Sequence, residues 1–182
     1  MAEEGFTPAL SHFGISVFDI ELMKNFYTKV FGFKVNDEGP GVTFNFRLVF
    51  LSSRPDVHHE LVLAENRPAD CSFSTVMQLS FKVQTLDQLR SVRKTALDNG
   101  AQKMRGLNHG NALSIYFSDP ENNTIEVYLD TPWYVPQPHG DPLDLNLPDD
   151  EIWKQTEAAV RKDPGFMLEA DRQKQFSSRA PS

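Results

Sequence analysis

The chain has 182 residues, 40% of them hydrophobic, which is enough for a substantial core but too few for two ordinary domains. Its net charge is −7 and its Lys and Arg residues are scattered, so we expect no nucleic-acid partner. No stretch approaches the roughly 18 apolar residues of a membrane-spanning helix. Cys71 is the single cysteine and no signal-peptide pattern opens the chain, which favours a reducing, cytoplasmic setting.

The first predicted elements are a strand and a helix. Leu10 to Val17 alternates between apolar and polar residues as a half-buried strand does. Asp19 is a candidate N-cap, and apolar residues then recur at helical spacing until Gly32 ends the helix. Three strand-like runs follow, and these are Phe33 to Asn36, Val42 to Leu51 and Val57 to Ala64. This half of the chain therefore predicts the order βαβββ.

The same order returns in the second half of the chain. Val76 to Val83 reads as a strand, and Thr85 to Gln88 has the spacing of a capping box before a helix that stops at Asn99-Gly100. Three more strand-like runs are Gln102 to Arg105, Ala112 to Phe117 and Thr124 to Leu129. We therefore predict an α+β domain over residues 8–131, built from two tandem βαβββ modules at 8–65 and 75–131.

Polar residues lie at related places in the two modules. An offset of 66 takes Val17 to Val83, His12 to Gln78 and Glu60 to Glu126. Polar side chains inside half-buried strands are exceptions to the pattern that mark a site. If the two sheets lie side by side, these four side chains can converge, and nitrogen and oxygen ligands of this kind suit iron, manganese, nickel, cobalt or zinc. The repeat therefore predicts a divalent-metal site where the modules meet.

Three stretches resemble the vicinal oxygen chelate superfamily, which includes glyoxalases, bleomycin-resistance proteins and type I extradiol dioxygenases. They are Ser11 to Val17, Asn25 to Phe33 and Tyr116 to Glu126. The resemblance covers residues 8–131. It implies a half-open barrel formed by the paired modules, with the metal inside it, and small-molecule substrates.

Several local features look more like extradiol dioxygenases than glyoxalases. His109-Gly110-Asn111, then Tyr116, then Glu126 ten residues later, is similar to the dioxygenase pattern, and His58-His59-Glu60-Leu61 resembles the stretch that supplies an acid–base histidine. The resemblance implies Fe(II) held by His12, Gln78 and Glu126. It also implies that a catechol-type diol and dioxygen are the substrates, with His59, Tyr116 and His109 handling protons.

Two alternatives stay open. Gln78 departs from the dioxygenase pattern, which has histidine there, whereas glyoxalases use four ligands of the types found at His12, Glu60, Gln78 and Glu126, often with zinc or nickel. A metal-free binding protein is the third reading. Strand neighbours face opposite ways, so the choice turns on whether His59 or Glu60 faces the barrel, with His58 expected toward solvent. The offset of 66 favours Glu60, and the local motif favours His59.

Beyond residue 131 the composition changes. Residues 131–142 are rich in proline and aromatic residues, so we expect an extended arm, followed by a helix that starts near Pro148. Trp133, Tyr134 and Trp153 are too apolar for a solvated tail, so residues 132–171 should pack on the domain or on a partner subunit. Residues 172–182 are expected to be disordered. Metal-dependent members of the superfamily are commonly dimers, and we expect a homodimer.

Overall fold

The computed structural model describes residues 9–71, 73–74 and 76–178. The chain folds as two compact units, Met1–Ser72 and Phe73–Ser182, and each is described in turn. The fold class is α+β, and the βαβββ order occurs twice, as predicted. Within the described ranges, no helix is both long and apolar enough to cross a membrane.

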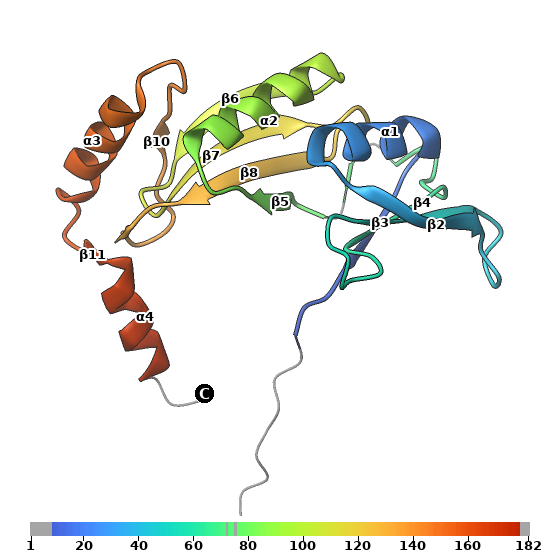
Figure 1. The fold of residues 1–182 in the computed structure, drawn as a ribbon, viewed down its shortest axis with the longest axis horizontal. Coiled ribbons are helices and arrows are strands. Elements are labelled where there is room, and N and C mark those ends of the chain that lie inside the picture. Colours follow the sequence, from blue (N-terminus) through green and yellow to red (C-terminus); the bar gives the residue numbers. More distant parts are fainter. Residues whose placement is uncertain (1–8, 72, 75, 179–182) are drawn as a thin grey trace, which may run out of the picture. The chain divides into compact units, whose positions relative to one another are not determined.

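The first unit is a four-stranded sheet covered by one helix (Figure 1). Its elements are β1 (Phe13–Ser16), α1 (Ile20–Phe31), β2 (Lys34–Pro40), β3 (Arg47–Ser52) and β4 (Leu61–Ala64). The strand order is β1-β4-β3-β2, with β1 parallel to β4 and the other pairs antiparallel. The strand predicted from Val42 starts only at Arg47, because residues 41–46 form the turn that joins β2 to β3.

Local sequence signals define helix α1. The Asp19 side chain accepts a hydrogen bond from the Leu22 amide at 2.9 Å, which caps the N-terminus. Gly32 ends the helix with a φ of 69°, a conformation that costs glycine little. The buried face of α1 packs against the sheet and contributes Ile20, Met23, Phe26, Tyr27 and Val30 to the core.

The second unit repeats the arrangement with a larger sheet. Its elements are β5 (Leu79–Lys82), α2 (Leu86–Asp98), β6 (Gln102–Asn108), β7 (Ala112–Ser118) and β8 (Thr124–Asp130). The strand order is β10-β6-β7-β8-β5, where β10 (Asp141–Pro142) comes from the C-terminal arm. Figure 1 shows α2 across one face of this sheet. Ile115, Phe117 and Val127 are buried, and side chains alternate along each strand, so the residues between them face the other way.

The arm packs on the second unit. Strand β10 pairs with β6, and Arg90 of α2 donates hydrogen bonds to the Leu145 and Leu147 carbonyls at 2.8 and 3.0 Å. A Cβ at Gly106 would lie 2.2 Å from the Leu143 carbonyl oxygen, so only glycine allows this close approach. Strand β9 (Trp133–Tyr134) and helix α3 (Asp149–Val160) enclose a small cluster formed by Trp133, Val135, Val160, Trp153 and Phe166.

The C-terminal residues differ from the prediction. After β11 (Met167–Leu168), helix α4 spans Glu169–Ser177, so residues 172–177 of the tail predicted to be disordered are helical. Glu169 pairs with Arg172 at 2.7 Å and Asp171 with Lys174 at 2.9 Å, and such pairs three residues apart support a helix. Residues 179–182 lie outside the described residues.

The turn between β7 and β8 sets the register of the strands that carry the candidate site. Asp119 is 1% exposed, and its carboxylate accepts hydrogen bonds from the Glu121 and Asn123 amides at 3.0 and 2.8 Å. Replacing Asp119 with alanine would leave buried amides unsatisfied, so we expect the free energy of unfolding to fall by about 2–4 kcal/mol. Urea denaturation measures this, with Asp171→Ala on exposed α4 as the control. A loss below about 0.5 kcal/mol would contradict the role assigned to Asp119.

Candidate functional site

A row of polar side chains crosses the sheet of the second unit. The strand register pairs Arg105 with Tyr116, Tyr116 with Glu126, and Glu126 with Ser80. Paired residues share a face of the sheet, so the row lies opposite the face that packs on α2. The strands therefore bring together the predicted Tyr116 and Glu126 and add two residues that the sequence analysis did not select, Arg105 and Ser80.

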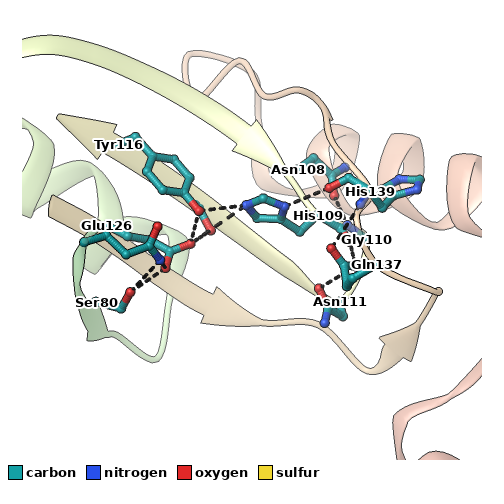
Figure 2. A network of polar contacts seen from close by, with 11 residues as sticks. Ser80, Asn108, His109, Gly110, Asn111, Tyr116, Glu126, Gln137 and His139 are labelled. Carbon is teal, nitrogen blue, oxygen red and sulfur yellow. Dashed lines mark hydrogen bonds and ion pairs between the residues drawn. The ribbon is translucent and has the colours of Figure 1, made fainter. Parts of the chain in front are cut away.

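The Glu126 carboxylate lies between Tyr116 and Ser80 in this row (Figure 2). It is 8% exposed and accepts four hydrogen bonds. Tyr116 and Ser114 donate to one oxygen at 2.5 and 3.0 Å, and Gln78 and Ser80 donate to the other at 2.8 and 2.7 Å. Within the part of the chain that the structure describes, no Lys or Arg forms an ion pair with it. The nearest basic group is His109, whose Nε2 lies 3.8 Å away.

His109 extends the network from Tyr116 to the C-terminal arm. Its Nε2 lies 3.0 Å from the Tyr116 hydroxyl, and its Nδ1 lies 2.8 Å from the His139 carbonyl oxygen (Figure 2). Gln137 donates to the His109 carbonyl at 2.9 Å. The arm therefore fixes the imidazole ring of His109 from one side, and Tyr116 fixes it from the other.

The contacts between the His139 carbonyl, His109, Tyr116 and Glu126 determine how many protons this series of groups can carry. The His139 carbonyl only accepts, so the His109 Nδ1 carries a proton. The contacts between His109 and Tyr116 and between Tyr116 and Glu126 need one proton each. A neutral histidine and a tyrosine supply two protons for these three contacts, so the series has room for one further proton. The side chains can therefore store a proton and pass it along the row.

Tyr116 stays protonated in this network. Burial first, and then the hydrogen bond and the negative charge of Glu126, raise the pKa of the Tyr116 hydroxyl far above its ordinary value. The cation of Arg105 acts in the opposite direction. Tyr116 is therefore a hydrogen-bond donor at neutral pH.

In the first unit, the His59 ring lies next to two other aromatic rings. The His59 ring lies 4.1 Å from the His12 ring and 5.3 Å from the Phe50 ring, measured between centroids. Ile15 is buried, so strand alternation gives its neighbour Gly14 the face opposite α1. Phe50 pairs with Val62, which pairs with Gly14 on that same face. His59 thus lies with His12 on the face that corresponds to the polar row of the second unit.

His58 links His59 to a carboxylate. Its Nε2 lies 2.7 Å from Asp37, and its Nδ1 lies 2.9 Å from the His59 Nδ1. Asp37 only accepts, so His58 donates to it from Nε2, and in its neutral form the His58 ring accepts at Nδ1 from His59. The His59 Nε2 is then an acceptor. His58 is exposed, as we expected, and it also contacts and orients His59. Burial, followed by the charges of His12 and His58, lowers the pKa of His59.

The Glu60 carboxylate, just before β4, is bound by residues of the loop between β3 and β4. The Ser53 amide and hydroxyl donate to one oxygen at 2.8 and 2.6 Å, and the Arg54 Nε donates to the other at 3.0 Å. Burial favours the neutral acid, but these hydrogen bonds and the Arg54 charge outweigh it and hold the pKa of Glu60 below its ordinary value. Glu60 therefore ties down the loop between β3 and β4.

The strand register also shows that the predicted equivalence of Glu60 and Glu126 is wrong. Gly14 pairs with Val62, and Ser80, its equivalent at an offset of 66, pairs with Glu126. The structural counterpart of Glu126 is therefore Val62, at an offset of 64. The chain from Phe50 to its partner Val62 is two residues longer than the chain from Tyr116 to its partner Glu126, and a single offset cannot represent this insertion. The first unit thus has an apolar residue at the position of the Glu126 carboxylate.

The types of these side chains fit a divalent cation. Glu126 is a buried carboxylate that accepts hydrogen bonds from neutral donors, and the Gln78 amide lies beside it, so both contribute oxygen atoms of the kind that such cations bind. Among the residues that the structure describes, no three His, Cys, Asp or Glu side chains are placed so that they could hold a metal ion.

The sequence analysis missed Asp37, Ser80, Arg105 and Ser114. Ser80 and Ser114 alternate correctly with buried neighbours, but serine inside a strand is a weak signal. Arg105 could have been found from its place three residues before the end of β6, which pairs with the Tyr116 strand. Asp37 could not, because the irregular register of β2 after Val35 decides which β3 residue it faces.

Comparison with known proteins agrees with this architecture. Residues 9–127 match the family model described as the Glyoxalase/Bleomycin resistance protein/Dioxygenase superfamily. The chain belongs to this superfamily, which confirms the resemblance seen in the sequence. The superfamily includes enzymes, and its members bind small molecules, several with a divalent metal.

Among curated proteins, the chain is similar to biphenyl-2,3-diol 1,2-dioxygenase 3 of Rhodococcus globerulus, with 26% identity over 132 residues. The alignment covers 68% of this chain and 64% of that relative. Among solved structures, the fosfomycin resistance protein FosX of Listeria monocytogenes, complexed with Mn(II) and sulfate, gives a TM-score of 0.55 at 19% identity, covering 69% of this chain and 95% of that one. A glyoxalase/bleomycin resistance protein/dioxygenase domain from Frankia gives 0.55 at 21% identity, covering 69% and 100%. The two structures support the fold.

Proposed function

We propose that this protein is an Fe(II)-dependent extradiol dioxygenase that cleaves the ring of a catechol-type aromatic diol. The observation that carries the proposal is the hydrogen-bonded series from His109 through Tyr116 to the buried Glu126, formed by three residue types at dioxygenase-like spacing. The relative named for a dioxygenase of biphenyl-2,3-diol supports the same reaction class. The reaction consumes one dioxygen for each diol and places both oxygen atoms in the opened product.

We assign the metal ligands to His12, Gln78 and Glu126. When bound, Fe(II) would supply open positions for the two diol oxygens and dioxygen, with zinc, nickel or manganese as alternative metals. The assignment rests on superfamily membership and on the buried Glu126 charge, which lacks a Lys or Arg partner among the described residues. The hydroxyls of Ser80 and Ser114 hold the carboxylate in place from either side.

Proton transfer is assigned to His59, Tyr116 and His109. His59 presents Nε2 as an acceptor, because His58 and Asp37 fix the other side of its ring, so it can take a proton from a diol hydroxyl. Tyr116 donates a hydrogen bond, and His109 stores the proton that Tyr116 exchanges with the product. Phe50, beside His59, offers an apolar face to the aromatic ring.

The glyoxalase-like alternative, a metal-dependent lyase or isomerase, is favoured by one observation. Residue 78 is an amide that contacts Glu126 where a dioxygenase would have a second imidazole. Two observations speak against a symmetric set of four ligands. The counterpart of Glu126 in the first unit is Val62, and Glu60 is paired with Arg54. A metal-free binding protein remains the third candidate, and reconstitution with metal separates it from the other two.

The test is elemental analysis of anaerobically purified protein, combined with an oxygen electrode and a panel of catechols after Fe(II) reconstitution. We expect about one iron per chain and oxygen uptake that depends on the catechol. Bound zinc or nickel without oxygen uptake would favour the glyoxalase-like reaction. No bound metal after reconstitution would reject both enzyme readings. We further propose a cytoplasmic homodimer, which sedimentation and fractionation would examine.

A further inference from the structure

Arg105 lies at one end of the polar row, and the proposed reaction gives it no role. Its side chain is exposed, and its guanidinium carbon lies 4.8 Å from the centre of the Tyr116 ring. It pairs with Tyr116 across β6 and β7, two strands away from Glu126. With strands about 5 Å apart, the guanidinium group starts from a backbone roughly 10 Å from that of Glu126, on the same face of the sheet.

The guanidinium of Arg105 has no carboxylate partner among the described residues. Most other arginines of the chain do have one, and these are Arg47, Arg54, Arg90, Arg161 and Arg172. In an acidic chain with a net charge of −7, an unpaired arginine beside a buried network is therefore unusual. Stacking on the Tyr116 ring restrains the guanidinium plane and leaves the N–H groups at its edge free to donate.

We infer that Arg105 binds a carboxylate substituent of the substrate, so that the preferred substrate is an aromatic diol with an acidic side chain. The diol part of this inference rests on the proposed function, and the acidic side chain is inferred from the position of Arg105. A guanidinium matches a carboxylate with two parallel hydrogen bonds, and no other cation is available in the row. An aromatic ring with a short side chain can bridge the distance from the Glu126 end of the row to Arg105.

The experiment compares two ligands that differ only in charge. Calorimetric titration of the anaerobic, Fe(II)-reconstituted protein measures the dissociation constants of 3-(3,4-dihydroxyphenyl)propionate and of its neutral primary amide. We expect the wild type to prefer the carboxylate. In Arg105→Gln the affinity for the carboxylate should fall roughly 10- to 100-fold, the loss typical of a hydrogen-bonded charge, while the affinity for the amide changes by less than about twofold. Arg105→Lys should retain part of the preference.

Arg161→Gln is the matched control, because Arg161 also stacks on an aromatic ring, with its guanidinium 5.2 Å from the Phe166 ring, but lies at the end of α3. It should leave both affinities unchanged. Thermal denaturation of Arg105→Gln establishes that the variant is folded. Equal wild-type affinities for the two ligands, equal losses in Arg105→Gln, or no binding of either ligand would overturn the inference.

Oxygen uptake separates this inference from the proposed function. Uptake with both ligands, together with equal affinities, would reject the role of Arg105 and leave the dioxygenase in place. Selective binding of the carboxylate without oxygen uptake would support the acid-binding role of Arg105 and reject the dioxygenase.

Discussion

Glu126→Ala is expected to abolish Fe(II) binding and catechol-dependent oxygen uptake. The substitution removes the buried anion that balances the cation and leaves four donors facing an empty position. The loss in iron affinity should exceed the roughly 10- to 100-fold that is typical of residues that only support a ligand. Iron analysis after dialysis, together with the oxygen electrode, measures both quantities.

Ser114→Ala is the matched control for Glu126, because Ser114 is equally buried and donates one hydrogen bond to the same carboxylate. It should weaken iron binding by no more than about 100-fold. Glu126→Gln keeps the size of the side chain and guards against a loss that comes only from misfolding. Iron binding by a folded Glu126→Gln protein with wild-type affinity would show that Glu126 is not a ligand.

His59→Gln is expected to lower kcat by about 10²- to 10⁴-fold, the usual contribution of a proton-transfer group. Its ring lies beside His12 and Phe50, with Nε2 available as an acceptor, so the loss should fall on turnover rather than on iron content. Glu60→Gln is the partner variant, because Glu60 adjoins His59 and its carboxylate is bound by Ser53 and Arg54.

Glu60→Gln should retain iron and most of the turnover, at the cost of a less stable loop between β3 and β4. The opposite pattern, with iron lost in Glu60→Gln and turnover kept in His59→Gln, would support the four-ligand glyoxalase-like site instead. Steady-state kinetics and metal analysis of the two variants side by side distinguish these outcomes.

The secondary structure could be predicted where its causes are local. Asp19 and Gly32 bound α1, and Thr85 starts α2, because capping depends on side chains within a few residues. The pairing of Tyr116 with Glu126 also follows from the sequence. A tight turn at Asp119 to Asn123 places residues on either side of its centre opposite each other, and these two are equally far from that centre.

The parts of the candidate site that could not be predicted depend on strand register, which the sequence did not determine. A constant offset of 66 made Glu60 the counterpart of Glu126, but the longer loop before β4 makes it Val62. Strand alternation assigned His59 and Glu60 to opposite faces, yet β4 begins only at Leu61, so alternation does not apply to either residue. The role of His58 was missed for the same reason.

The most direct test of the proposed reaction is to supply ¹⁸O₂ to the Fe(II)-reconstituted protein with a catechol and to analyse the product by mass spectrometry. The proposal predicts a ring-opened product that carries both labelled oxygen atoms, formed with one dioxygen consumed per diol. A metal-loaded, folded protein that leaves the diol intact and incorporates no label would contradict it.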